Sequence, residues 1–294
     1  MFADLFKRRL ETGEFKASRA LERNFEDLKS DIERQIKADI DAFRKKCETK
    51  WEQELFTQKR RLADAERSLA SKETKKSRES ARIAKNKIET HKRWLSDLRR
   101  TELIDEDSRI FPMMMAPVVA TLDGQRRVIP MRYTCRLAGK PADYDFRYPG
   151  TYNARRDSLA GFWSNVYGRR HAIMMVDEFF ENVPLHLYEK RDLAAGEKEA
   201  NVVLRFRPDT SAPMLVACLW DHWKKPGEAD LFSFAAITDE PPPEIAATGH
   251  QRCIISLREK NVREWLEPEV LAPSRLDEIL SDKECPYYEH RVAA

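Results

Sequence analysis

The first 110 residues almost lack the two residue types that interrupt helices. All 15 prolines lie at or after Pro112, and only one of the 9 glycines, Gly13, precedes Gly124. Proline and glycine are the strongest local markers of turns and breaks, so this part of the chain is free to form long helices. The 294 residues, enough for one or two domains, therefore change in character near residue 110.

Cysteine is scarce, and long apolar runs are missing. The five cysteines are Cys47, Cys135, Cys218, Cys253 and Cys285. They show no CxxC spacing, which argues against a disulfide-stabilised secreted domain and favours a reducing compartment. No apolar run approaches the roughly 20 residues of a membrane helix, and the N-terminus lacks the apolar stretch of a signal peptide. These absences predict a cytoplasmic protein without a membrane partner.

Charge is abundant but nearly balanced. Charged residues make up 35% of the chain, above the usual quarter, yet the net charge is only +3. This balance does not indicate a nucleic-acid partner by itself. Locally, nine Lys or Arg stand against three Glu from Lys72 to Arg93. That stretch is either a solvated helical face or a contact for backbone phosphates, whose binding is sensitive to salt.

Apolar periodicity predicts helices in the part that lacks proline. Residues 1–16 carry a small apolar face and predict the end of a short helix. From 17 to 70, apolar residues recur mostly at steps of three or four, which predicts one long helix with a single stripe. The stripe comprises Leu21, Phe25, Leu28, Ile32, Ile36, Ile40, Phe43, Cys47, Trp51, Leu55, Leu62, Ala65 and Leu69. A second helix over 77–102 follows a short polar link, so we expect an antiparallel helical hairpin, a coiled coil.

From Pro112 onward the pattern is that of short strands. Strands are predicted at 117–122, 127–133, 201–206, 214–220, 231–238 and 249–257, and helices at 157–167 and 261–266. Asp123-Gly124 is a hairpin turn signal between the first two strands. Many short strands with few helices predict a β-rich α+β domain with mixed or antiparallel strands. We assign Trp220 and Trp223 to its core, and we expect the polar residues after Pro268 to be loosely packed.

The most informative stretch runs from His171 to Asn182. Five apolar residues, 172–176, precede two acids, then an aromatic pair, then Glu181. Such a run predicts a buried strand that emerges at an edge or cleft. A carboxylate directly after two aromatics is partly desolvated, which raises its pKa towards a value useful in acid–base chemistry. The alternative is an acidic strand end that faces water.

Six short motifs occur in a fixed order. They are Met131-Arg132-Tyr133, Asn153-Ala154-Arg155, Val176-Asp177-Glu178-Phe179-Phe180-Glu181, Ala217-Cys218-Leu219-Trp220 with Trp223, Ser233-Phe234-Ala235-Ala236-Ile237-Thr238, and His250-Gln251-Arg252. In order and spacing, over about 109–268, the set resembles the SOS response-associated peptidase family, the abasic-site processing proteins. The resemblance implies a β-rich core that starts with 1–16 and resumes at 109–268. A helical hairpin, 17–108, would be inserted in it, and 269–294 would be a C-terminal tail.

The resemblance also implies an activity. In that family an N-terminal cysteine, exposed after removal of the initiator methionine, attacks the aldehyde of an abasic site in single-stranded DNA. Its α-amine and thiol close a thiazolidine ring, which makes a stable but reversible protein–DNA crosslink. The same cysteine releases itself from its leader peptide. We therefore expect a self-processing peptidase of the SOS and DNA damage response, a hydrolase or lyase that acts in DNA repair.

Three catalytic residues are implied by the matched motifs. Glu181 corresponds to the family's catalytic glutamate, which would move protons between amine, aldehyde and hydroxyl. His250 corresponds to the histidine that protonates the opened sugar oxygen, and Asn153 to the asparagine that orients amine and sugar. The alternatives are a structural histidine at a strand start and a turn asparagine. No second ligand lies at a useful spacing from His250, so we expect no metal and no cofactor.

Four further residues are implied as DNA contacts. Arg155 and Arg252 match family arginines that grip phosphates, a role suited to the rigid guanidinium fork. Arg132 and Tyr133 stand where the family has Arg-Trp, with the aromatic ring available to stack on a base. The alternative for Arg155 is the start of the following helix.

One departure from the family concerns the nucleophile. The family carries cysteine at position 2, where this sequence has Phe2. Cys47 and Cys135 have no free α-amine, so neither can form a thiazolidine. Two explanations are open: a start upstream of Met1 that encodes Met-Cys, or a degenerate member that binds DNA without crosslinking. A hypothesis of a different class is a coiled-coil interaction protein whose hairpin contacts a protein partner or a second copy.

Overall fold

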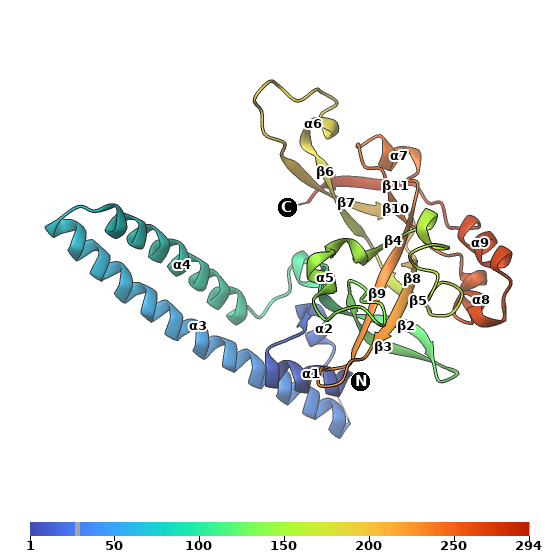
Figure 1. The fold of residues 1–294 in the computed structure, drawn as a ribbon, viewed down its shortest axis with the longest axis horizontal. Coiled ribbons are helices and arrows are strands. Elements are labelled where there is room, and N and C mark those ends of the chain that lie inside the picture. Colours follow the sequence, from blue (N-terminus) through green and yellow to red (C-terminus); the bar gives the residue numbers. More distant parts are fainter. Residues whose placement is uncertain (27–29, 294) are drawn as a thin grey trace. The chain divides into compact units, whose positions relative to one another are not determined.

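The computed structural model describes residues 1–26 and 30–293. The chain divides into two compact units, Met1–Arg109 and Ile110–Ala294 (Figure 1). The first, the helical unit, consists almost entirely of helices, and the second, the strand-rich unit, holds most of the strands. The mixed α+β class predicted from the sequence is confirmed. The finer boundaries at 16 and 268 remain predictions.

The helical unit contains the predicted hairpin. Its elements are α1 (Phe2–Thr12), the short strand β1 (Lys16–Ala17), α2 (Arg19–Arg23), α3 (Asp31–Ser71), α4 (Lys75–Arg99) and the 3-10 turn η1 (Asp105–Ser108). Helices α3 and α4 run antiparallel (Figure 1). Their buried apolar residues are Ile36, Ile40 and Ala65 on α3 and Ala81, Ala84, Ile88 and Leu95 on α4. The rings of Trp51 and Trp94 meet across the hairpin with centroids 5.4 Å apart.

The prediction of one continuous helix over 17–70 is wrong. Helix α2 ends at Arg23, and α3 starts anew after Ser30. The Ser30 hydroxyl accepts a hydrogen bond from the Glu33 N–H at 3.3 Å, and the Glu33 carboxylate accepts one from the Ser30 N–H at 2.9 Å. This capping box satisfies two backbone donors and defines a new helix start. Leu28, part of the predicted stripe, lies outside the described residues.

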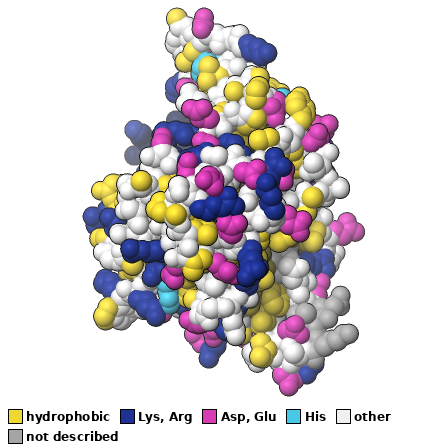
Figure 2. All heavy atoms as spheres, turned by 90° about the vertical axis from the view of Figure 1, so that its right-hand side faces the viewer, with side chains coloured by type: hydrophobic (Ala, Val, Ile, Leu, Met, Phe, Trp, Pro, Cys, Tyr) yellow, Lys and Arg dark blue, Asp and Glu magenta, His cyan; other side chains and the backbone are white. Residues whose placement is uncertain are grey.

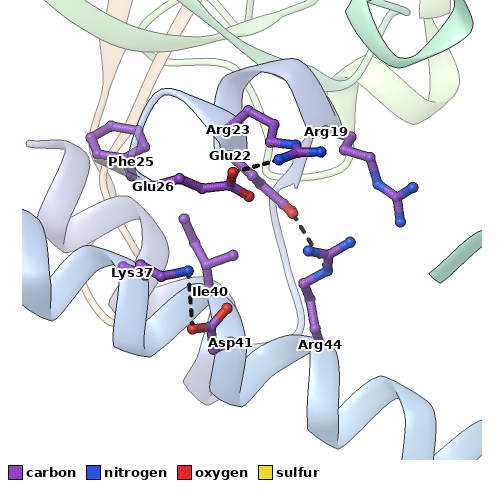
Figure 3. A pocket seen from close by; sticks show the side chains of 9 residues that line it. All are labelled: Arg19, Glu22, Arg23, Phe25, Glu26, Lys37, Ile40, Asp41 and Arg44. Atoms are coloured by element: carbon purple, nitrogen blue, oxygen red, sulfur yellow. Dashed lines mark hydrogen bonds and ion pairs between the residues drawn. The ribbon is translucent and has the colours of Figure 1, made fainter. Parts of the chain in front are cut away.

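The base of the hairpin is held by charged contacts. Arg9 of α1 forms a buried ion pair with Glu22 of α2, and its guanidinium lies 4.3 Å from the centroid of the Phe43 ring. Arg44 of α3 approaches the same glutamate at 3.9 Å (Figure 3). Arg19 donates to backbone carbonyls at the end of α4, which is the negative end of that helix. These contacts attach α2 to both hairpin helices.

The strand-rich unit is built around a closed, barrel-like sheet. Its strands follow the order β2–β3–β9–β8–β5, and β2 also pairs with β5, which closes the sheet. They span Met114–Leu122 (β2), Gln125–Tyr133 (β3), His171–Val176 (β5), Met214–Trp223 (β8) and Leu231–Asp239 (β9). Two short strands, β4 (Asn153–Arg155) and β10 (Cys253–Ile254), pair with the second half of β9. The far end of β9 is therefore where these short strands converge.

The β2–β3 hairpin turns at the predicted Asp-Gly pair. Asp123 and Gly124 both have positive φ, at 52° and 72°. A two-residue type I′ turn requires positive φ at both central residues. The turn signal in the sequence is thus confirmed.

A second sheet has the order β6–β7–β11, with β6 at Phe179–Pro184, β7 at Asn201–Pro208 and β11 at Tyr288–Val292. The stretch from His171 to Asn182 contributes to both sheets, because the chain bends at Asp177 between β5 and β6. Glu178 at this bend forms an ion pair with Arg205 of β7. The predicted emerging strand therefore carries Glu181 out of the barrel and into the second sheet.

The core of this unit contains the two predicted tryptophans. Trp220 and Trp223 are 6% and 2% exposed. His171 is also buried, with the rings of Tyr167 and Trp265 at centroid distances of 5.6 and 3.9 Å. Burial lowers the pKa of His171 to about 3, so this histidine is a neutral core residue at physiological pH.

The predicted helix over 157–167 is wrong. These residues form the end of a 3-10 turn, η3 (Arg156–Ser158), followed by further turns. The apolar spacing does describe burial, since Leu159, Trp163 and Val166 are buried, whereas Phe162 is 42% exposed. Serine, asparagine and glycine recur between them and favour turns over helix.

The residues after Pro268 are well packed, contrary to our expectation. Helix α9 (Pro273–Ser281) buries Leu276, Ile279 and Leu280, and β11 completes the second sheet. The spacing of three and four places these apolar residues on one face of the helix. The remaining helices are α5 (Tyr144–Arg147), α6 (Leu185–Tyr188), α7 (Pro243–Ala246) and α8 (Val262–Trp265).

Acidic and basic side chains are interspersed over the face drawn in Figure 2. Elsewhere on the strand-rich unit, opposite charges form ion pairs, for example between Arg275 and Glu264 and between Arg156 and Asp277.

Across the described part of the chain, every helix is too short or too polar to span a bilayer.

Candidate functional site

Glu181 and His250 form a direct contact. Glu181 lies on β6 in the second sheet, and His250 lies in the loop between α7 and β10. The imidazole Nε2 is 3.2 Å from the Glu181 Oε2, and the His250 and Glu181 side chains are 19% and 22% exposed. Residues far apart in the sequence thus meet in one acid–base pair that solvent can reach.

Gly249 allows the His250 loop to approach β6 closely. Its φ is 93°, and a Cβ at this position would lie 2.8 Å from the Leu187 Cβ and 3.4 Å from the Val183 Cγ1. A residue with a side chain meets both backbone strain and a steric clash there. Val183 lies on β6, two residues beyond Glu181, so this approach sets how near the histidine comes to the glutamate.

We expect Gly249→Ala to lower the free energy of unfolding by about 1–3 kcal/mol more than Gly227→Ala does, because of overpacking against Leu187. Gly227 is the matched control, since its φ is 79° and a Cβ added there would have no atom within 4 Å. Both variants strain the backbone, but only one creates the clash. Urea denaturation of the two variants measures the difference, and equal losses would show that the close approach is unimportant.

The His250 ring lies between two hydrogen-bond acceptors. Its Nδ1 is 2.7 Å from the Arg252 carbonyl oxygen and 3.4 Å from the Arg252 backbone nitrogen. Because the carbonyl contact is much the shorter and a carbonyl can only accept, we place a proton on Nδ1. Its Nε2 faces the Glu181 carboxylate. Burial lowers the pKa of His250, but the hydrogen bond to Glu181, the charge of Glu181 and the Arg252 carbonyl outweigh it, so the pKa is raised overall. The arrangement favours the doubly protonated ring, a proton donor.

The His250 pKa provides a direct test of this pairing. We expect NMR titration to give a value above the ordinary 6.5 or so in the wild type and a lower value in Glu181→Gln, because burial is then opposed mainly by the Arg252 carbonyl. Because the pKa of His250 is higher in the folded than in the unfolded chain, the pair stabilises the fold fully below the unfolded-state pKa of His250. This contribution is lost as the pH rises through the folded-state pKa of His250. An identical His250 titration in both proteins would contradict the pairing.

Asn153 and Tyr133 contact each other, and the strands that carry them both pair with β9. Asn153 starts β4 and Tyr133 ends β3, and both strands pair with β9. The Tyr133 hydroxyl donates to the Asn153 Oδ1 at 3.4 Å. The Tyr133 ring stacks on Phe234 at 5.1 Å and meets the edge of Tyr152 at 5.8 Å. The amide of Asn153 is therefore oriented by an aromatic residue that is itself held by two neighbours.

The charge of Glu181, the partner of His250, also acts on Tyr133, the partner of Asn153. Burial raises the pKa of Tyr133, and Cys218 and Glu181 add to this effect. Burial also raises the pKa of Cys253 to about 12, again with a contribution from Glu181. Glu181 thus lies within electrostatic range of Tyr133, the partner of Asn153. The Cys253 thiol, which sequence reasoning passed over, stays protonated at neutral pH and lacks the thiolate that a nucleophile requires.

Arg155 and Arg252 converge on one carboxylate. Asp157 Oδ2 lies 2.7 Å from an Arg155 guanidinium nitrogen and 3.4 Å from one of Arg252. The hydrogen bond from Arg155 is the main reason that the pKa of Asp157 is lowered. Two cations against one anion leave a net positive charge on a surface whose Arg155 and Arg252 side chains are 56% and 29% exposed. Sequence reasoning did not single out Asp157, although an acid two residues after Arg155 is a readable signal.

Arg132 lies apart from these residues. Its side chain is 7% exposed and its guanidinium pairs with Asp145, whose side chain is 0% exposed and also binds Arg136 at 2.7 Å. A phosphate oxygen would have to displace a fully buried carboxylate to reach it. Arg132 is therefore not among the DNA contacts that we propose.

A metal site would need a cluster of His, Cys, Asp or Glu side chains. Within 1–26 and 30–293, no three such residues are grouped so that they could hold a metal ion.

Comparison with known proteins gives several weak structural likenesses, three of which are described here, and one family. A protein from Bacteroides thetaiotaomicron is 14% identical over 62% of this chain and 75% of that chain, with a TM-score of 0.48. A protein from Bordetella bronchiseptica is 17% identical over 63% and 86% respectively, with a TM-score of 0.47. A phage-related protein from the same organism is 18% identical over 61% and 78%, with a TM-score of 0.44. No curated protein matches the chain.

The family match covers the site. The sequence model of the SOS response associated peptidase (SRAP) family matches residues 70–293, well over half of the chain. The matched range contains Asn153, Glu181 and His250, the residues that the strand-rich unit arranges around β6, β9 and their loops. The chain therefore belongs to the SOS response associated peptidase (SRAP) family.

Proposed function

We propose that this protein binds single-stranded DNA at abasic sites and handles the aldehyde of the opened sugar between Asn153, Glu181 and His250. The observation that carries the proposal is the 3.2 Å contact between the Glu181 carboxylate and the His250 ring, within the range matched by the family. A carboxylate and a histidine in contact can exchange and deliver protons. Arg155 and Arg252 supply the positive charge that would hold flanking phosphates.

Each residue has a distinct role in the proposal. Glu181 accepts a proton from an attacking amine and returns it to the departing oxygen. His250, with its raised pKa, donates a proton to the opened sugar oxygen. Asn153 uses its amide as donor and acceptor to orient amine and sugar. Tyr133 is proposed to support Asn153 and to present its ring to a base.

Crosslinking requires a nucleophile of the family type. When an N-terminal cysteine attacks, the aldehyde carbon bonds to the amine nitrogen and to the thiol sulfur, and the carbonyl oxygen leaves as water. Position 2 of this chain is Phe2, whose ring packs on Phe25 at 5.7 Å. We propose that covalent attachment, like the self-processing peptidase step, requires a cysteine with a free α-amine, which an added Met-Cys start supplies in the test below.

The test is incubation with single-stranded DNA that carries one abasic site. The chain with an added Met-Cys start should form an adduct that survives a denaturing gel, and the chain as it stands should bind the lesion without an adduct. Undamaged DNA of the same sequence is the control. Equal binding of damaged and undamaged strands by both versions would contradict the proposal.

A second candidate is a member of the family that binds without crosslinking. The observation in its favour is again Phe2, which lies in α1 and contacts Phe25 as a packing residue. On this alternative the strand-rich unit binds single-stranded DNA, and the hairpin serves as a coiled-coil interaction module. The absence of an adduct even with a Met-Cys start, together with retained binding, would favour this candidate.

A further inference from the structure

The tip of the helical hairpin, residues 57–82, carries an excess of positive charge. It contains nine Lys or Arg and four Asp or Glu. All four acids are already ion-paired, in the pairs Asp64–Arg67, Glu66–Lys85, Glu73–Arg78 and Glu79–Arg82. Six cations are left without an acidic partner among the described residues: Lys59, Arg60, Arg61, Lys72, Lys75 and Lys76. Arg78 and Arg82, prominent in the sequence, are therefore less available than their neighbours.

Three of these unpaired cations line one groove between the two helices. The groove has a volume of about 520 Å³ and is bordered by Thr57, Arg60, Arg61, Asp64, Ala65 and Ser68 of α3 and by Lys76, Ser77 and Ser80 of α4. Arg61 donates to the Ser80 hydroxyl at 3.0 Å, which holds its guanidinium over the groove. The single acid, Asp64, is engaged by Arg67. The groove thus presents cations and hydroxyl groups together.

The tip cations are unfavourable for the free protein. Helix α4 begins after Thr74, whose hydroxyl accepts from the Ser77 N–H at 3.1 Å. Its first turn contains Lys75 and Lys76 and no acid. The N-terminal end of a helix carries partial positive charge and favours acids over bases. Cations that repel both one another and this helix end are relieved when an anion binds near them.

The chemistry of the groove fits a phosphate backbone. Guanidinium and hydroxyl groups are the usual donors to phosphate oxygens, and such contacts carry no sequence information. The lining has no aromatic side chain, so bases cannot stack there as they do in single-strand grooves. A duplex offers the denser array of phosphates, about one charge per 1.7 Å of axis.

A lipid surface fits the tip less well. From Thr57 to Arg93, a range that the structure describes completely, no large apolar side chain is exposed, and Phe56, one residue before this range, is a single ring at 71% exposure rather than an apolar face. Helices that bind membrane surfaces bury an apolar face among the lipids in addition to their charge contacts. The tip therefore has the charge but lacks the apolar surface.

We propose that the hairpin tip binds the phosphate backbone of double-stranded DNA, without reading its sequence, through Arg60, Arg61 and Lys76. The choice of DNA among polyanions rests on the proposed function, whereas the groove and its charge do not. The chain then has two nucleic-acid contacts of different kinds: lesion chemistry in the strand-rich unit and duplex binding in the helical unit.

The test is fluorescence anisotropy with the full chain and a labelled, lesion-free duplex at several NaCl concentrations. Each phosphate contact contributes about 0.9 to the slope of log K against log salt, so Arg60→Ala/Arg61→Ala/Lys76→Ala should reduce that slope by about 2.7. The control is Lys45→Ala/Lys50→Ala/Lys87→Ala, which removes the same charge from exposed hairpin residues outside the tip. Its slope should stay close to that of the wild type.

An equal loss of slope in the control would overturn the proposal, because general charge would then explain binding. Unchanged duplex binding by the tip variant, with loss of binding to anionic phospholipid vesicles, would overturn it in favour of a membrane surface. Should the triple variant fail to show the wild-type circular dichroism, Arg60→Gln/Lys76→Gln should reduce the slope by about 1.8. Neither assay uses an abasic site, so the two proposals fail independently.

Discussion

Glu181→Gln should slow adduct formation with abasic single-stranded DNA by about 10²- to 10⁴-fold, the usual contribution of a positioned acid–base group. The protein for this measurement carries the added Met-Cys start, and the rate is read from denaturing gels over time. Glutamine keeps the size of the side chain but cannot take up a proton. It also removes the charge that, with its hydrogen bond, holds the pKa of His250 above its ordinary value.

The control for this variant is Glu289→Gln. Glu289 is an exposed residue of β11 in the same sheet as Glu181, and the substitution removes the same charge. Its adduct rate should match that of the wild type. A normal rate in Glu181→Gln would mean that the contact with His250 is structural, and the assignment of Glu181 as the proton carrier would be withdrawn.

Asp145→Ala should lower the free energy of unfolding by about 3–5 kcal/mol, the typical loss when one partner of a buried ion pair is removed. Asp145 is 0% exposed and lies between Arg132 and Arg136. The guanidinium of Arg136 is held further by the Trp223 ring, at 4.6 Å from its centroid. Removing the carboxylate would leave two buried cations facing each other without an anion.

Asp143→Ala is the matched control for Asp145→Ala. Asp143 pairs with Arg147, but the two side chains are 51% and 66% exposed. Exposed pairs contribute between about 0 and 1 kcal/mol, so chemical denaturation should show little change. If both variants lost the same small amount of stability, the buried cluster around Asp145 would not be a stabilising feature of the fold.

The alternation of side chains along a strand already indicated that Arg132 and Tyr133 face opposite sides of the sheet. Successive side chains on a strand point to opposite faces of the sheet, so Arg132 and Tyr133 of β3 were never suited to one common surface. The structure agrees with this periodicity, since Tyr133 contacts Asn153 whereas Arg132 pairs with buried Asp145. The family motif placed both residues correctly on one strand, but the partner that buries Arg132 comes from a segment that no local pattern links to it.

Local signals also account for the errors in the secondary structure. Ser30 and Glu33 form a capping box, a readable helix start, but our prediction followed the apolar stripe through 17–70 and did not consider this signal. In 157–167 the apolar spacing described burial correctly, while the backbone adopted turns. Periodicity reports which residues face the core, and only the hydrogen-bonding competition of serine, asparagine and glycine decides whether a helix forms.

The sequence by itself determined the helical hairpin, the Asp-Gly turn, the β-rich domain and the six motifs of the family, because each depends on residues close together in the chain. Only the tertiary structure decided that Glu181 and His250 touch, that Gly249 permits it, and that the tip arginines of α3 share a groove with Lys76 of α4. The physical reason is that such contacts depend on how sheets and helices pack, and packing brings together residues that no local spacing relates.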